Sequence, residues 1–487
     1  MNGQDAAAGP GWNHARLPAS GQVKMAVSDY ALGLVAVLVG LALRVAYAAH
    51  ASPYIDEFTT IWAAQRVLSV GLPQFPSGVL YTQGLLYTYL EAVALGLGIE
   101  FSVLLTRLPS LVLSAVTLST LVYAARRLFR TWPMGLAAFW LAVDPQAIIW
   151  GGRARTYALL QLLMLVAFLA WYHGAVDGDR PKARWLAIGL LSASLIDQPL
   201  TLLVLPPFAI LAMIARGWHW LRQPLVWLQA AVMVAVVATR WFLYQMMIPA
   251  GATATAEARN FVDLTQPLVA WGGLANYFSS PNRWIPTVLL VAGALSMLLF
   301  RRLRGVSGRR SVLSIAFLLA FVVIEMLLVV GTAWRAPRYL LPVLPLLFLG
   351  AEGVMVPALR WMSEQVPRLL PKQALAGLTG VLLVAIVLLA YPDALAAANR
   401  DEWGYDRAMA VVGDQWGEGD ALATIAPAAA FVMLDRADYL AVEEGAQALA
   451  VERGGRRVDG WTNLPFLDSP AHLAEALEHH SGVWFVA

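Results

Sequence analysis

The sequence contains no cysteine and few charged residues. Without cysteine the chain forms no disulfide bond and offers no thiolate ligand to a metal ion. Charged residues make up 13% of the 487 positions, against roughly 25% in an average soluble protein. A soluble chain with so little charge would expose large apolar patches. These shortages exclude a cytosolic enzyme, a nucleic-acid-binding protein and a disordered scaffold.

Apolar residues take the place of the missing charges. They account for 59% of the chain, and the mean hydropathy is +0.63. They gather in eleven runs whose lengths suit membrane helices, so an all-α polytopic membrane bundle with about 11 transmembrane helices is expected. The runs are 26–49, 103–125, 133–150, 156–173, 185–197, 199–215, 224–247, 285–300, 311–331, 339–356 and 375–391.

Two stretches of this pattern need a separate assignment. The polar triplet Asp197-Gln198-Pro199 interrupts the apolar stretch 185–215, and it favours two short helices over one long tilted helix. The segment 83–98 is apolar but short, and it contains Glu91. We therefore predict an interfacial or re-entrant helix there instead of a twelfth span.

The distribution of basic residues predicts the orientation of the chain. With eleven spans, 18 Lys and Arg residues in short loops fall on one side of the membrane, and far fewer fall on the other. The positive-inside rule makes the richer side cytoplasmic. We expect a cytoplasmic leader at 1–25, a transmembrane domain at 26–391 and an extracytoplasmic first loop at 50–102. The protein is thus expected in the cell membrane as a multi-pass protein.

The C-terminal part has a different composition from the rest. Residues 392–487 contain 16 Asp and Glu residues and six Arg. We predict that they form a small acidic α/β domain on the extracytoplasmic side, where the eleven-span topology places the C-terminus.

The loop after the first span carries two adjacent carboxylates. It reads His50-Ala-Ser-Pro-Tyr54-Ile-Asp56-Glu57, so a turn presents both acids close to the membrane surface. Asp56 is a candidate general base. Its alternative role is to cap a helix that begins at Glu57, and one carboxylate can do both. His50 and Tyr54 are candidates for the wall of a substrate cavity.

Paired arginines lie at two other places on the predicted outer face. Arg153 and Arg155 precede Tyr157, and Arg335 and Arg338 precede Tyr339. Because guanidinium groups form paired, charge-assisted hydrogen bonds with phosphate, these four arginines are candidate phosphate ligands. The alternative is that they extend toward lipid headgroups.

Four further residues are candidates for the same cavity. Tyr157 and Tyr339 follow the arginine pairs directly. Asp197 lies in the polar break and Arg240 lies late in the run 224–247. A lone Asp or Arg within a span is also commonly part of a structural pair.

Three motifs in this order resemble the GT-C superfamily of integral-membrane glycosyltransferases, in particular the glycosyltransferase family 39-like proteins. They are YIDEF after the first span, GGRARTYALL after the third and RAPRYLLPVLP before the tenth. The relatives include protein O-mannosyltransferases and aminoarabinose transferases. The resemblance implies that the first-loop Asp56 acts in catalysis and that the donor is a sugar on a polyprenyl phosphate.

The chain departs from the family at one place. Some relatives have a lysine for the lipid phosphate where this chain has Asp197-Gln198-Pro199. The relatives also differ in their need for a divalent cation, so Mg²⁺ or Mn²⁺ remains an option, and Glu57 would either orient the acceptor or help to bind the ion.

The sequence thus favours a glycosyltransferase that moves a sugar from a polyprenyl-phosphate-linked donor to an acceptor hydroxyl or amine at the extracytoplasmic face. Inversion at the anomeric carbon is expected. The acceptor is left open among lipid, polysaccharide and protein, and membrane lipids are the other partners. One alternative is a transporter or lipid flippase with the same charges on its translocation path. The other is a non-catalytic assembly or receptor subunit.

Overall fold

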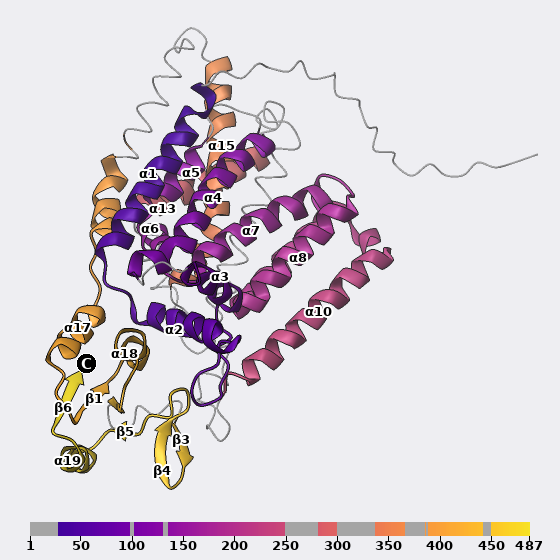
Figure 1. Cartoon of the computed structure of the whole chain (residues 1–487). Helices are drawn as coiled ribbons and strands as arrows, with labels where there is room; N and C mark the ends of the chain where they lie inside the picture. Colours follow the sequence, from indigo (N-terminus) through magenta and orange to yellow (C-terminus); the bar gives the residue numbers. More distant parts are fainter. Residues whose placement is uncertain are drawn as a thin grey trace, which may run out of the picture.

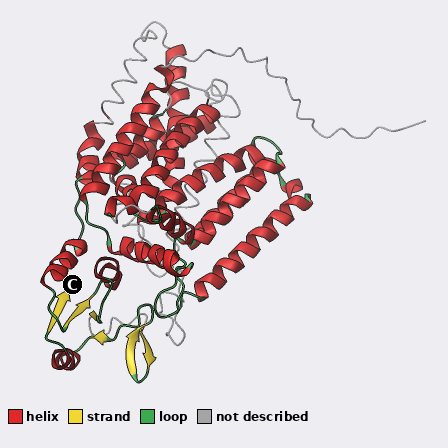
Figure 2. Ribbon diagram, viewed as in Figure 1, coloured by secondary structure: helices red, strands yellow, loops and turns green. Residues whose placement is uncertain are grey.

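The computed structural model describes residues 28–97, 102–129, 135–248, 281–299, 337–365, 385, 388–441 and 450–487 of the chain. A helical bundle forms the larger part, and a smaller region of helices and strands lies at one end of it (Figure 1). Two short helices, α2 and α3, lie between the two parts. Within the described ranges all named strands belong to the C-terminal region (Figure 2).

The bundle is built from apolar helices of 8 to 27 residues. Its helices are α1 (Ser28–His50), α4 (Val103–Phe129), α5 (Leu136–Val143), α6 (Pro145–Gly152), α7 (Tyr157–Trp171), α8 (Pro181–Asp197), α9 (Leu205–Arg216), α10 (Pro224–Gln245), α13 (Pro281–Leu299) and α15 (Leu344–Gln365). The shorter helical turns are η1 (Tyr172–Val176), η2 (Pro199–Val204), η3 (Trp218–Arg222) and η4 (Pro337–Val343).

Six helical stretches of the described chain are long and apolar enough to cross a membrane. They are Ala31–His50, Val103–Leu128, Tyr157–Val176, Pro199–Arg216, Pro224–Gln245 and Arg338–Met355. The predicted run 311–331 and most of 375–391 lie outside the described residues. The C-terminal end of the latter run continues into a helix over Leu388–Ala398.

The predicted run 133–150 is two helices instead of one. The chain breaks between α5 and α6 at Asp144, whose carboxylate accepts a hydrogen bond from the Ala147 amide at 2.9 Å. Pro145 occupies the first position of α6, where its missing N–H costs nothing. Asp144 also forms an ion pair with Arg283 of α13 at 2.8 Å. A prediction of one straight span there is wrong, because these polar contacts lie inside the bundle.

The structure has two helices over 185–215, as the polar break predicts. α8 ends at Asp197, and Gln198 is extended with φ −142° and ψ 118°. Pro199 then opens η2, which leads into α9. Because of this break, Gln198 lines the polar cavity that is described in the next subsection.

α2 (Ile55–Val70) and α3 (Leu85–Leu95) form the first loop. α3 has 11 residues, which corresponds to about 16 Å of helix. The hydrocarbon core of a bilayer is about 30 Å thick. α3 is therefore too short to span it, in agreement with the predicted interfacial or re-entrant helix.

The C-terminal region is a small α/β unit. Its four-stranded parallel sheet has the order β5-β2-β1-β6, and β3 and β4 form a separate antiparallel hairpin. Its elements are α17 (Tyr405–Gln415), β1 (Asp420–Thr424), α18 (Pro427–Leu434), β2 (Tyr439–Ala441), β3 (Ala450–Arg453), β4 (Arg456–Asp459), β5 (Phe466–Leu467), α19 (Pro470–His479) and β6 (Gly482–Val486).

Aromatic side chains join this unit to the first loop. Trp62 of α2 stacks on Phe431 of α18, with ring centroids 4.6 Å apart and planes inclined by 2°. Its ring also stacks on Phe75 at 4.4 Å. A shared apolar core continues through both parts. The C-terminal unit is therefore packed against the loop that carries the two adjacent carboxylates.

Candidate active site

A polar cavity of about 280 Å³ lies where the bundle, the first loop and the C-terminal unit meet. It brings together residues of all three sequence motifs and one residue of the C-terminal unit. Its walls are formed by Asp56, Thr59, Tyr81, Gln83, Arg155, Tyr157, Gln198, Arg338, Tyr339 and Trp461.

Asp56 lies in the first turn of α2 and faces this cavity. Its side chain is 37% exposed. The cap of α2 comes from the neighbouring acid: the Glu57 carboxylate accepts a hydrogen bond from the Tyr54 amide at 2.8 Å. The alternative role of Asp56 as the helix cap is therefore wrong, and its carboxylate is left for the cavity.

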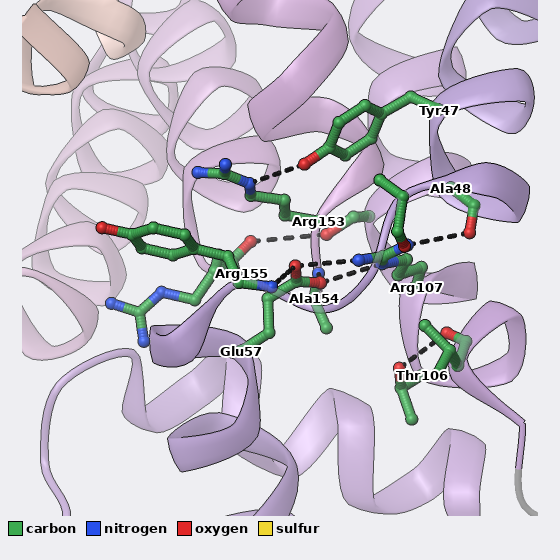
Figure 3. A network of polar contacts seen from close by, with 12 residues as sticks. Tyr47, Ala48, Glu57, Thr106, Arg107, Arg153, Ala154 and Arg155 are labelled. Atoms are coloured by element: carbon green, nitrogen blue, oxygen red, sulfur yellow. Dashed lines mark hydrogen bonds and ion pairs between the residues drawn. The ribbon is translucent and has the colours of Figure 1, made fainter. Parts of the chain in front are cut away.

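Glu57 does not line the cavity; it is completely buried and faces Arg107 (Figure 3). Its two oxygens accept both prongs of the Arg107 guanidinium, at 2.9 and 3.0 Å. A further hydrogen bond comes from the Ala154 amide at 2.8 Å. Burial alone would raise the pKa of Glu57, but Arg107 and the backbone donors hold that pKa below its usual value.

Arg107 of α4 connects this pair to the end of α1. Its guanidinium donates to the carbonyls of Ala48 at 2.9 Å, Ala51 at 2.7 Å and Ser52 at 3.2 Å. A cation at the C-terminal end of a helix compensates carbonyls that have no partner within the helix. The Glu57–Arg107 pair thus joins α1, α2, α4 and the turn after α6.

Arg155 holds the other side of the Asp56 turn. One nitrogen of its guanidinium donates to the Asp56 carbonyl at 3.0 Å, to the Thr60 hydroxyl at 2.9 Å and to the Tyr81 hydroxyl at 2.9 Å. Another lies 3.6 Å from the Asp56 carboxylate. The Nε of Arg155 is buried and has no hydrogen-bond partner in the part of the chain that the structure describes. The cavity wall therefore contains a fixed cation, Arg155, next to the partly exposed carboxylate of Asp56.

Arg153 has a different environment from Arg155. The Arg155 amide donates to the Arg153 carbonyl at 2.8 Å in the tight turn after α6. This turn sends the two side chains apart, and Arg153 extends toward Tyr47 (Figure 3). Arg153 forms a buried ion pair with Glu402 and lies 4.3 Å from the ring centroids of Tyr54 and Trp150. It does not line the cavity, and its geometry is that of a clamp between the bundle and the C-terminal segment.

The third motif contributes Arg338 and Tyr339 to the cavity. The Arg338 guanidinium carbon lies 5.6 Å from the Trp150 ring centroid and 5.4 Å from that of Tyr339. The Arg338 Nε is buried, and no described residue forms a hydrogen bond with it. Tyr157 packs edge-on against Trp150 at 4.6 Å. Arg335 lies outside the described residues.

The other predicted cavity residues lie around the cavity without lining it. Asp197 is fully buried and accepts hydrogen bonds from the Thr156 hydroxyl and from the Tyr87 amide in the first turn of α3. Arg240 is buried and donates to the Thr82 hydroxyl at 3.2 Å. His50 is exposed at the end of α1, and Tyr54 packs on Trp150. For Asp197 the structural role is the one observed, and its neighbour Gln198 lines the cavity instead.

The sequence did not indicate Arg107, Tyr81, Glu402 or Trp461 as site residues, nor Thr59, Gln83 and Gln198 of the cavity wall. Arg107 carried a usable signal, because a lone arginine inside an apolar run needs a partner or a function. Tyr81, Glu402 and Trp461 carried none, since each is one of many polar or aromatic residues in its segment. Their importance depends on contacts across hundreds of positions, such as that of Arg153 with Glu402.

The residues present do not form an evident metal site. Among the described residues, no three His, Asp or Glu side chains gather in a way that would hold a metal ion. Both oxygens of Glu57 are already used by four protein donors. Asp56 is the one acid among the residues lining the cavity. No catalytic step is therefore assigned to a divalent cation.

The structure is thus a helical bundle with stretches apolar enough to cross a membrane, and a polar cavity with an acid, arginines and tyrosines lies at one end of it. Comparison with known proteins shows which class has these features. The model of the dolichyl-phosphate-mannose-protein mannosyltransferase family matches residues 83–243. None of the curated proteins matches the chain.

Solved structures share the fold. ArnT from Cupriavidus metallidurans, bound to undecaprenyl phosphate, superposes with a TM-score of 0.58 at 12% identity, over 87% of each chain. The oligosaccharyltransferase from Archaeoglobus fulgidus, in complex with Zn and sulfate, gives a TM-score of 0.51 at 11% identity. That match covers 79% of this chain and 56% of the other. The resemblance to the GT-C superfamily expected from the motifs is thus confirmed.

Proposed function

We propose that the protein transfers a sugar from a polyprenyl-phosphate-linked donor to an acceptor hydroxyl or amine at the extracytoplasmic membrane face. The observation that carries this proposal is the cavity in which the Asp56 carboxylate, the Arg155 guanidinium and Arg338 converge. A base can take the proton of the acceptor, and cations can stabilise the charge on the leaving phosphate, in a displacement at a glycosyl phosphate. The shared fold with an undecaprenyl-phosphate-bound enzyme supports the donor class.

In the proposed reaction the acceptor oxygen or nitrogen attacks the anomeric carbon. Asp56 takes the proton of the acceptor as the new bond forms. The bond from the anomeric carbon to the phosphate oxygen breaks, and the electron pair leaves with the polyprenyl phosphate. Because attack and departure occur on opposite faces of the carbon, the product has inverted configuration.

Arg155 and Arg338 are the proposed ligands of the departing phosphate. Both line the cavity, Arg155 from the turn after α6 and Arg338 from η4, and the Nε of each has no hydrogen-bond partner among the described residues. Two arginines can stabilise the charge that grows on the phosphate as the bond breaks. Arg153 is proposed to position the turn that carries Arg155, because its own guanidinium is committed to Tyr47 and Glu402.

A small apolar pocket, about 20 Å³ in volume, adjoins the cavity on the bundle side. It shares Tyr157, Gln198 and Tyr339 with the cavity. Its other lining residues are Leu160, Met164, Leu200, Thr201, Val204 and Pro342. We propose that the first isoprenoid units of the donor leave the cavity along this surface, which keeps the lipid chain in apolar surroundings.

The direct test is a donor-cleavage assay. The purified chain in lipid nanodiscs is incubated with polyprenyl phosphates carrying labelled hexoses, pentoses or aminosugars, and release of polyprenyl phosphate is followed. A glycosyltransferase cleaves at least one donor, by transfer or by slow hydrolysis. A flippase moves the lipid across the bilayer and leaves it intact, and that result would refute the proposal.

Substitutions of the arginines are expected to have different effects on the donor KM and on kcat. Arg155→Gln and Arg338→Gln should raise the donor KM and lower kcat, because both charges contact the leaving phosphate. Lys should restore activity only in part, since it keeps the charge but loses the two-pronged geometry. Arg153→Gln should lower kcat and thermal stability with the donor KM unchanged. Arg335→Gln is measured in the same series.

Arg436 in the C-terminal unit provides the matched control, because it pairs with Asp438 at the surface. Arg436→Gln should leave both constants unchanged. If Arg155 and Arg338 only contact lipid headgroups, their Lys variants will equal the wild type and the donor KM will not move.

Orientation can be tested independently of activity. The chain has no native cysteine, so single cysteines are labelled without background. We expect a membrane-impermeant maleimide to reach Glu418→Cys in intact cells and to reach Arg310→Cys only after the membrane is opened. Labelling in the reverse order would place the C-terminal unit in the cytoplasm and contradict the proposed topology.

A further inference from the structure

The cavity has one wall that comes from outside the membrane domain. Among its lining residues, Trp461 alone belongs to the C-terminal unit. It lies in the turn between β4 and β5, and its side chain is partly buried. A residue of this unit therefore lies beside the proposed catalytic base, although the two are about 400 positions apart in the sequence.

The turn that presents Trp461 is held by hydrogen bonds to Asp459. One carboxylate oxygen of Asp459 accepts from the Trp461 amide at 3.2 Å, the Thr462 amide at 2.8 Å and the Thr462 hydroxyl at 2.6 Å. Asn463 has a left-handed conformation with φ 65°, and its amide donates to the Asp459 carbonyl at 2.8 Å. Such a turn holds its side chain in one place.

Contacts with the first loop fix the ring relative to the reacting groups. The Trp461 carbonyl accepts a hydrogen bond from the Ser77 amide at 3.3 Å. Its ring lies edge-on to Tyr81 at 6.3 Å, and the Tyr81 hydroxyl accepts from Arg155. The chain of contacts from Trp461 to Tyr81 to Arg155 ends at Asp56. These contacts hold the ring in one position beside the site.

We propose that Trp461 forms the floor of the acceptor subsite and that the acceptor is a carbohydrate. This inference rests on the proposed function. In an inverting displacement the acceptor lies opposite the leaving phosphate. Arg338 belongs to the bundle and Trp461 to the C-terminal unit, and we therefore assign the leaving phosphate to the Arg338 side and the acceptor to the Trp461 side.

The other lining groups fit a sugar ring. Thr59, Gln83 and Gln198 provide a hydroxyl and two amides that can both donate and accept hydrogen bonds. A tryptophan face provides an apolar platform for the C–H face of a pyranose. The volume of about 280 Å³ is near the lower end of small-molecule sites, about 300–1,000 Å³. It suits single rings better than an extended peptide.

The test measures acceptor binding and donor cleavage separately. Binding of methyl glycosides to the full chain is followed by saturation-transfer NMR. The chain is held in nanodiscs, because glycoside detergents would compete with the methyl glycosides for the site. Hydrolysis of the donor by water and sugar transfer to the same glycosides are measured with a polyprenyl-phosphate-linked sugar that the wild type cleaves in the donor-cleavage assay. Trp461→Ala should weaken glycoside binding and raise the acceptor KM at least about tenfold. Donor KM and hydrolysis should stay at the wild-type values.

Trp461→Phe keeps an aromatic face and should recover part of the acceptor affinity. Trp403→Ala is the matched control, since that ring is 73% exposed; it should behave as the wild type. The proposal is overturned if Trp461→Ala binds glycosides normally or changes the donor KM instead. It is also overturned if the wild type binds no glycoside and transfers to serine-containing peptides.

The two hypotheses fail in different ways. If the wild type cleaves no donor but binds methyl glycosides through Trp461, the glycosyltransferase proposal fails and the carbohydrate site stands. If it cleaves a donor and the tryptophan has no effect on glycosides, the transferase proposal stands and the acceptor inference fails.

Discussion

Asp56→Asn is expected to reduce sugar transfer by about 10²-fold or more, with the protein folded and inserted normally. The substitution keeps the shape of the side chain and removes its ability to accept a proton. Because Asp56 is partly exposed and does not cap α2, little stability depends on it. Transfer is measured with the purified variant in nanodiscs, with thermal unfolding measured on the same sample.

The matched control is Glu418→Gln, an exposed acid of the C-terminal unit. It should retain full activity. Near wild-type turnover by Asp56→Asn would remove Asp56 from the role of base. A large loss of thermal stability in that variant would show that the carboxylate supports the fold instead of the chemistry.

Glu57→Gln is expected to have the largest effect on stability. It leaves the Arg107 cation buried without its counter-charge, and breaking one side of a buried pair typically costs about 3–5 kcal/mol. Per folded molecule, transfer should fall less than in Asp56→Asn, since Glu57 does not line the cavity. Replacing both partners, as Glu57→Leu with Arg107→Met, should be less destabilising than the sum of the single changes.

The pH dependence of stability gives a second measurement on this pair. The pKa of Glu57 in the folded protein is lowered, so its carboxylate contributes stability above its unfolded pKa. That contribution is lost as the pH falls through the folded value. Thermal unfolding of the wild type should therefore decline on the acid side, and Glu57→Gln should show less of this decline.

The control pair is Arg456 and Glu475, both at the surface of the C-terminal unit. Glu475→Gln should change stability by less than about 1 kcal/mol, as exposed ion pairs do. An equally small effect of Glu57→Gln would contradict the assigned role of the buried pair.

Much of the local architecture follows from the sequence by itself. The apolar runs predict the helices of the bundle, because transfer of side chains into hydrocarbon depends on composition over about 20 residues. The break at Asp197-Gln198-Pro199 and the short helix α3 follow from local polarity and length. The motif around Asp56 and the arginine motifs were recognisable for the same reason: charge at a span end is a local property.

The roles within each motif needed the tertiary structure. Asp56 and Glu57 are neighbours of the same chemical type, yet one faces the cavity and the other a buried guanidinium. Arg153 and Arg155 are separated by one residue, yet a tight turn directs only Arg155 to the cavity. No sequence pattern distinguishes the members of either pair, because the direction of a side chain depends on what packs around it.

The class of the protein was therefore determined by the sequence, and the composition of the site by the fold. Hydropathy and loop charge determine how each segment interacts with lipid and water, so they can be evaluated for one segment at a time. The partnerships of Glu57 with Arg107, Arg153 with Glu402 and Trp461 with Tyr81 join separate segments. Each forms only because the bundle, the first loop and the C-terminal unit pack together and bring those segments within a few ångströms of one another. In buried surroundings the free energy of a charge or of an aromatic ring depends on the residues that contact it.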